Sequence, residues 1–152
     1  MISYAVENPC HSGIELLIEA LNIEIDSMTP AETNQKLTVK DMDNPTTTVI
    51  VARDNGVAVA CGALVWHNKT TGEIKRMYTM PEYRGKGISR EILSKLERIA
   101  IVGFNLRELV LETGYNYNAA IALYKKLGWV ECPPVLDYEA NPYSVFFRKA
   151  IL

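Results

Sequence analysis

The chain has 152 residues, a formal net charge of -2 and 48% hydrophobic residues. These values predict a single globular domain over residues 1–152, and they argue against a disordered chain or a basic nucleic-acid-binding protein. No apolar run approaches the length of a membrane span. The first residues lack the charged and apolar segments of a signal peptide, and the three cysteines are widely spaced, so we expect a cytoplasmic protein without disulfides. The two histidines are isolated in the sequence, and we expect no metal site.

The first third of the chain predicts a strand followed by helical segments. Ile2–Val6 has the composition of a short strand, and apolar residues at helical spacing predict a helix from Ile14 to about Ile25. Thr29 followed by Pro30 is compatible with the start of a second short helix, because threonine caps helices and proline suits a first turn. Residues 40–45 are polar and are interpreted as a turn.

Three consecutive antiparallel strands are expected next. Residues 46–53 are rich in threonine and valine, Asp54-Asn55-Gly56 predicts a hairpin turn, and residues 57–67 form the return strand. A polar turn over residues 68–72 leads to a third strand over residues 73–80. Strict alternation along this strand would place Ile74, Arg76, Tyr78 and Met80 on one face and Glu73, Lys75, Met77 and Thr79 on the other.

The stretch after the third strand has the features of an anion-binding loop. Pro81 ends the strand because proline has no N–H for a sheet, and Gly85 and Gly87 permit backbone angles that other residues resist. The apolar spacing of residues 88–103 predicts a helix directly after the loop. Unpaired N–H groups and the positive end of the helix dipole at its start would attract phosphates.

The spacing of the loop residues narrows the choice of phosphate ligand. A dinucleotide-binding loop would have a third glycine where Arg90 stands, and an ATP-binding loop would have serine or threonine directly after Lys86. The pattern that remains is Arg84-x-x-Gly87-x-Ser89, to which Arg84 and Lys86 add positive charge. It resembles the acyl-CoA pyrophosphate loop of the GNAT superfamily of N-acetyltransferases, which usually has glycine or alanine at the position of Ser89.

The C-terminal third predicts a strand, a helix and two further strands. The strand covers residues 106–112, the helix covers residues 118–127 with Gly128 as its C-cap, and the last strands lie near residues 129–131 and 144–149. The helix has an apolar inner face that consists of Ala120, Leu123, Tyr124 and Leu127.

This helix carries a second resemblance to the GNAT superfamily, whose corresponding segment reads Asn-x-x-Ala-x-x-Leu-Tyr-x-x-x-Gly-Phe. The residues that match in place are Ala120, Leu123, Tyr124, Gly128 and the aromatic Trp129. Tyr117 stands at the family's asparagine position, and Asn118 lies one position later. The resemblance covers residues 47–131 and implies the GNAT fold of small single-domain bacterial enzymes: an α/β fold with a mixed, mostly antiparallel central sheet and helices on both faces.

The same resemblance implies an N-acetyltransferase that transfers the acetyl group of acetyl-CoA to a primary amine of a small molecule by direct attack on the thioester. Tyr124 would protonate the departing sulfur and Glu73 would be the general base, with Glu112 or a water chain as the alternative. The pantetheine arm would contact Met77, Tyr78 and Thr79. The pyrophosphate would contact Arg84, Gly85, Lys86, Gly87, Ile88 and Ser89, with Arg90 and Asn118 as further cofactor contacts. Candidates for the acceptor wall are the loop residues Tyr115, Tyr117, Tyr138 and Tyr143.

Three questions stay open at the level of the sequence. The acceptor is a small amine in the leading interpretation, whereas a protein N-terminus or lysine is the alternative. A CoA-binding module without catalysis is a further alternative. The assembly state, monomer or homodimer, is also open.

Overall fold

The computed structural model describes residues 1–29 and 37–151. Its elements in chain order are β1 (Ile2–Val6), α1 (Ile14–Met28), α2 (Val39–Met42), β2 (Thr47–Asp54), β3 (Val57–Trp66), β4 (Thr71–Thr79), a short 3-10 helix (Pro81–Tyr83), α3 (Ile88–Arg98), a π-helical turn (Ile99–Gly103), β5 (Glu108–Gly114), α4 (Asn118–Lys126), β6 (Val130–Cys132) and β7 (Ser144–Ala150). None of the helices described is long and apolar enough to cross a membrane.

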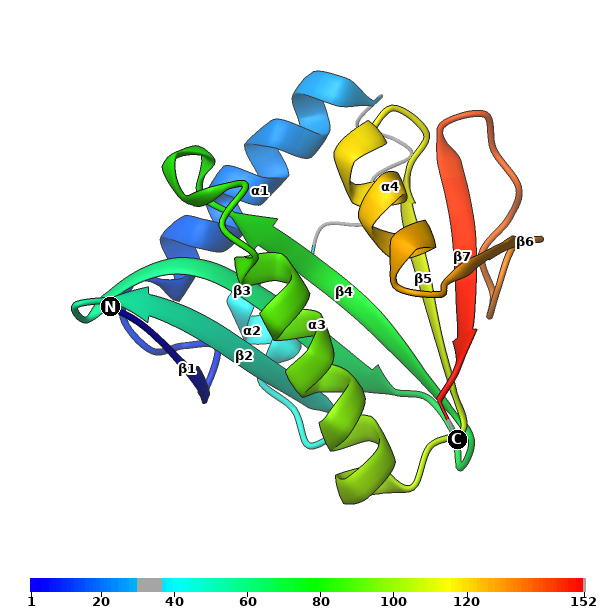
Figure 1. Cartoon of the computed structure of the whole chain (residues 1–152), viewed down its shortest axis with the longest axis horizontal. Coiled ribbons are helices and arrows are strands. Elements are labelled where there is room, and N and C mark those ends of the chain that lie inside the picture. The colour runs from blue at the N-terminus through cyan, green and yellow to red at the C-terminus, as the bar shows by residue number, and fades with distance from the viewer. Residues whose placement is uncertain (30–36, 152) are drawn as a thin grey trace.

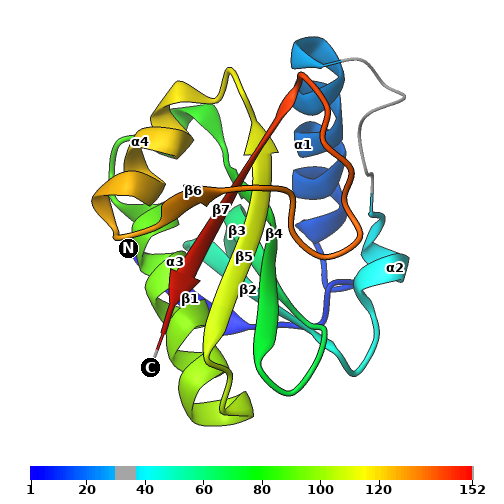
Figure 2. The same cartoon turned by 90° about the vertical axis from the view of Figure 1, so that its right-hand side faces the viewer.

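The strands form one sheet in the order β1-β2-β3-β4-β5-β7-β6, with α3 connecting β4 to β5. The β4–β5 pair is parallel and the other neighbouring pairs are antiparallel. Helices α1 and α2 cover one face of the sheet, and α3 and α4 cover the other (Figures 1 and 2). The predicted element order and the mixed sheet with helices on both faces are confirmed.

Two apolar clusters attach the helices to the sheet. The α3 face includes Ile92 and Leu96, which are fully buried and pack with residues of α4 and β5. The α1 face includes Ile14 and Leu17, which pack against β2, β3 and Met42 of α2. Burying one such aliphatic side chain stabilises the fold by about 1.5–3 kcal/mol, so each amphipathic helix is held by its inner stripe.

Strand β4 contains a bulge that the predicted alternation does not include. Arg76 adopts a left-handed backbone with φ of 55°, and the register of β4 against β3 shifts at this point. Ile74 and Met77 both pack on the α3 face, whereas Tyr78 packs on the α1 face and Arg76 reaches Asn22 of α1. The prediction that Ile74 shares a face with Arg76 and Tyr78 is therefore wrong, because one extra residue reverses the sides from Arg76 onward.

Two predicted boundaries also differ from the structure. The segment interpreted as a turn over residues 40–45 begins inside α2, whose start is fixed by a capping box: the Asp41 N–H donates to Thr38 Oγ1 at 3.2 Å, and the Thr38 N–H donates to Asp41 Oδ2 at 2.9 Å. Helix α1 continues to Met28, beyond the predicted end. The second short helix predicted to begin near Pro30 falls on residues 30–36, outside the described part of the chain.

Candidate functional site

A cavity of about 760 Å³ opens where β4 and β5 separate. Residues Thr71–Ile74 of β4 pair with residues 108–111 of β5, and the ladder ends there. The bulge at Arg76 follows two residues after its last pair. Beyond the ladder, α1 and the loop before β7 close one side of the cavity, and α3 and α4 close the other. The predicted site residues that line it are Glu73, Met77, Tyr78, Thr79, Arg84, Gly85, Gly87, Ile88, Ser89, Arg90, Asn118 and Tyr124.

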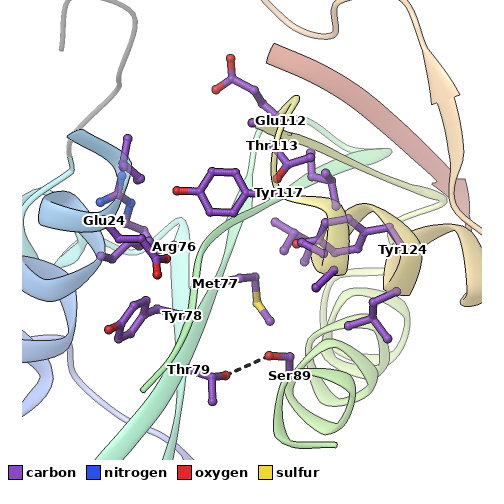
Figure 3. Close-up of a pocket in the computed structure, with 18 of the residues that line it drawn as sticks. Glu24, Arg76, Met77, Tyr78, Thr79, Ser89, Glu112, Thr113, Tyr117 and Tyr124 are labelled. Carbon is purple, nitrogen blue, oxygen red and sulfur yellow. Dashed lines mark hydrogen bonds between the residues drawn. The ribbon is translucent and has the colours of Figure 1, made fainter. Parts of the chain in front are cut away.

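The loop before α3 presents backbone N–H groups to one end of this cavity. Gly85 and Gly87 have φ of 77° and 80°, and a Cβ placed on either would meet no atom within 4 Å. The N-cap residue of α3 is Gly87, which has no side chain to accept a hydrogen bond from the first turn. The backbone N–H groups of that turn are therefore not capped by it and can donate to a ligand. Thr79 Oγ1 and Ser89 Oγ lie 2.9 Å apart and tie the end of β4 to this turn (Figure 3).

The two basic side chains of the loop have different positions. Arg84 lies in the cavity wall, where its Nε donates to the Thr79 carbonyl at 2.8 Å and its Nη2 donates to Glu24 Oε1 at 2.9 Å. Arg84 therefore links the loop to α1. The Lys86 ammonium lies over the Tyr83 ring, 5.2 Å from its centroid, and Lys86 is not part of the cavity wall.

Tyr124 projects from the inner face of α4, as predicted, and only 6% of its surface is exposed. Its ring packs against those of Trp129 and Phe147, with centroids 5.9 and 6.0 Å away. Figure 3 shows Tyr124 across the cavity from Glu24 and Arg76, with Met77 between them. Burial raises the pKa of Tyr124 to about 12, so its hydroxyl keeps its proton at neutral pH and can act as a donor.

Glu73 is 2% exposed, and both of its carboxylate oxygens are engaged. His67 Nε2 lies 2.8 Å from Oε1, and the Tyr138 hydroxyl donates to Oε2 at 2.5 Å. Lys75 Nζ donates to the same Tyr138 oxygen at 3.0 Å and lies 3.7 Å from Glu73 Oε2. His67 is isolated in the sequence, but the turn before β4 brings it back to Glu73.

Glu112 lies on β5 at the end of the cavity away from Ser89 (Figure 3). Burial raises the pKa of its carboxyl group. A hydrogen bond with Ser144 and the charge of Lys75 lower this pKa and so offset part of the rise. A carboxyl group with a raised pKa is a better proton acceptor when ionised, so the geometry keeps Glu112 as an alternative base.

Three of the four loop tyrosines considered from the sequence line the cavity: Tyr117, Tyr138 and Tyr143. Tyr115 instead lies outside the wall, half exposed and packed beside the Tyr143 ring. The hydroxyl of Tyr117 is buried without a hydrogen-bond partner in the described part of the chain, and burial raises the pKa of Tyr117 to about 12. Asn118 begins α4 beside it.

Comparison with known proteins gives concordant results. The sequence matches the model of the acetyltransferase (GNAT) family over residues 15–129. It is 34% identical over 151 residues to an IAA acetyltransferase of Azospirillum brasilense, covering 99% of this chain and 98% of that protein. It is 29% identical over 153 residues to the uncharacterised N-acetyltransferase YedL of Escherichia coli (strain K12), covering 99% and 96%. A crystal structure from Klebsiella pneumoniae, described as an acyl-CoA N-acyltransferase, superposes with a TM-score of 0.84 at 30% identity and covers 100% of this chain and 99% of that one.

Proposed function

Since the chain belongs to the acetyltransferase (GNAT) family, we propose that it transfers the acetyl group of acetyl-CoA to a primary amine of a small molecule. The observation that carries the proposal is that one cavity brings together the start of α3, the separated strands β4 and β5, Tyr124 and Glu73.

The cavity wall suits the parts of acetyl-CoA. The open space above Gly85 and Gly87 and the N–H groups at the start of α3 suit a pyrophosphate. Beyond Ile74, the edge of β4 that faces the gap no longer pairs with β5. Backbone N–H and C=O groups of residues 77–79 can therefore form hydrogen bonds with the amide groups of a pantetheine arm. Bound acetyl-CoA would supply a thioester that an amine can attack.

The residues around the gap suit the proton transfers of acetyl transfer. An amine attacks only in its neutral form, so the acceptor ammonium needs a base, and the Glu73 carboxylate lines the cavity beside the last pair of the β4–β5 ladder. The departing sulfur needs a proton, and the buried Tyr124 hydroxyl can donate one. The narrow gap would hold thioester and amine in one orientation, which supplies a further part of the rate.

The size of the cavity favours a small acceptor. Sites for small molecules and cofactors have volumes of about 300–1,000 Å³, and this cavity of about 760 Å³ must also hold the acetylated end of the cofactor. The room that remains lies between α1 and the loop that carries Tyr138 and Tyr143, and it suits a compact amine.

A transfer assay tests the proposal. The protein would be incubated with acetyl-CoA and, separately, with simple amines, amino acids, an aminoglycoside and peptides, while free thiol and acetylated product are followed. Transfer to a small amine supports the proposal. Transfer to peptides alone would replace it with protein acetylation, and no transfer to any acceptor would refute it.

A further inference from the structure

The carboxylate of Glu73 is almost fully buried, and each of its two oxygens already has a hydrogen-bond partner. Its side chain is 3% exposed, and His67 and Tyr138 occupy its two oxygens at 2.8 and 2.5 Å. Each of these partners could carry a proton from the cavity to Glu73 along an existing hydrogen bond. His67 is not part of the cavity wall, whereas Tyr138 is.

Within residues 1–29 and 37–151, the hydrogen bonds of Tyr138 leave one position free on its oxygen. A phenol oxygen has one O–H and two lone pairs. The O–H donates to Glu73 Oε2, and one lone pair accepts from Lys75 Nζ at 3.0 Å. The second lone pair remains for an N–H of the acceptor.

We propose that Tyr138 relays the proton of the acceptor ammonium to Glu73 and is the catalytic residue that touches the amine. The inference rests on the proposed acetyl transfer. An N–H bond of the ammonium breaks and its proton joins the Tyr138 oxygen, while the O–H proton of Tyr138 moves to Glu73 Oε2. The nitrogen keeps the electron pair and attacks the thioester carbonyl. Tyr138 and Glu73 both end this step neutral.

The surroundings of Tyr138 favour a relay over a phenolate. Burial and the adjacent Glu73 raise the pKa of Tyr138 above its ordinary value, with a smaller contribution from Glu112 on β5 and opposition from Arg76. The phenol therefore passes on one proton as it receives another, and it does not lose its own beforehand.

Neighbouring groups hold the relay in place. The Tyr138 ring packs against Phe146 of β7, with centroids 5.7 Å apart, and the Lys75 ammonium lies 5.7 Å from the Tyr138 ring centroid. His67 fixes the far oxygen of Glu73. Lys75 and His67 are positioning residues in this arrangement.

The test compares Tyr138→Phe with Tyr115→Phe, a matched control that removes a hydroxyl outside the cavity wall. The acceptors are butylamine, methoxyethylamine and trifluoroethylamine, in falling order of basicity, each with acetyl-CoA at neutral pH. Tyr138→Phe should lower kcat/KM for butylamine by about 10²–10⁴-fold, the range of one acid–base group. The loss should shrink for trifluoroethylamine, which is mostly neutral in solution. Tyr115→Phe should stay within a few-fold of wild type.

Glu73→Gln and the double variant complete the test. Members of one relay are not additive, so the double variant should be about as slow as either single variant. A Tyr138→Phe enzyme within a few-fold of wild type, an equal loss for all three amines, or multiplied losses in the double variant would overturn the relay. A wild-type protein that acetylates none of these three amines and none of the small amines of the transfer assay would instead contradict the proposed function, and the relay with it. Thermal unfolding of each variant checks that it is folded.

Discussion

At the scale of single residues, Gly87 combines a left-handed backbone with an empty space above it at the start of α3. We predict that Gly87→Glu weakens acetyl-CoA binding by about 10²-fold or more, because a carboxylate would stand where a pyrophosphate has to approach, and opposed like charges cost several kcal/mol. Isothermal titration calorimetry with acetyl-CoA measures the effect.

Gly56→Glu is the matched control for this prediction. Gly56 also has a positive φ, of 88°, and open space at its Cβ, but it lies in the β2–β3 hairpin turn away from the cavity wall. Both variants therefore carry a similar backbone cost, about 1–2 kcal/mol, and the same added charge. Equal losses of affinity in the two variants would mean that Gly87 has no special relation to the cofactor.

Tyr124 differs from an ordinary tyrosine because of its burial. With its pKa raised to about 12, proton transfer to a thiolate of reference pKa about 8.5 is uphill by about 5 kcal/mol in reference terms. The transfer then has to accompany cleavage of the C–S bond, while the thiolate is still forming. We predict that Tyr124→Phe lowers turnover by about 10²–10⁴-fold and leaves acetyl-CoA affinity nearly unchanged.

Steady-state kinetics and calorimetry on Tyr124→Phe measure both quantities. The change retains the ring contacts with Trp129 and Phe147 and removes only the hydroxyl. Burial raises the pKa of Tyr124 to about 12, so the hydroxyl is still protonated at pH 10, the ordinary pKa of a tyrosine. Wild-type turnover should therefore not fall near pH 10 through ionisation of Tyr124. Turnover of the variant within a few-fold of wild type would show that the sulfur leaves without help from Tyr124.

At the scale of elements, the approach of α3 to the sheet depends on Gly62 of β3. A Cβ on Gly62 would lie 2.4 Å from Met77 Sδ and 2.8 Å from Ile92 Cγ2. We predict that Gly62→Ala lowers the free energy of unfolding by about 1–3 kcal/mol, because the helix and the bulged part of β4 would have to move apart. Urea unfolding measures this change.

Gly103→Ala is the comparison for this effect. A Cβ on Gly103 would meet its nearest neighbour, Ile99 Cγ2, at 3.7 Å, which is ordinary van der Waals contact. This change should be neutral or slightly stabilising, because alanine reduces the freedom of the unfolded chain. If both variants lost the same stability, the crowding at Gly62 would not be the cause.

The elements that the sequence predicts well are those set by local patterns. The Asp54-Asn55-Gly56 turn has the expected left-handed pair, with φ of 49° at Asn55 and 88° at Gly56, and the loop glycines before α3 have positive φ. Helix α2 also has a local signal, Thr38 followed three residues later by Asp41, which the turn interpretation overlooked. In each case the information lies within a few residues.

The features that escaped prediction depend on distant partners. The bulge at Arg76 is set by pairing with β3 and by the space that Gly62 leaves, so a period of two along β4 cannot reveal it. The same holds for the acceptor side of the site, where Tyr138 reaches Glu73 across 65 positions of the chain. Sequence motifs thus indicated the cofactor side, and only the fold showed how Glu73 is held.

At the scale of the whole molecule, the sheet consists of two parts joined by a short seam. Strands β1–β4 form one part and β5, β7 and β6 the other, and four residue pairs between β4 and β5 connect them. The cavity continues this seam beyond Ile74. A ligand that fills the gap would therefore bridge the two parts of the sheet.

We predict that acetyl-CoA slows amide hydrogen exchange along residues 77–79 and at the start of α3, and leaves the β1–β2 ladder nearly unchanged, since that ladder lies at the far edge of the sheet. At a concentration of about 100 times Kd, binding stabilises the folded state by about 2.7 kcal/mol, or roughly 5–10 °C in Tm for a domain of this size. Exchange followed by mass spectrometry, with Gly87→Glu as the control, separates local from general protection. Protection spread evenly over the sheet, or confined to the β1–β2 edge, would mean that the ligand does not occupy the gap between β4 and β5.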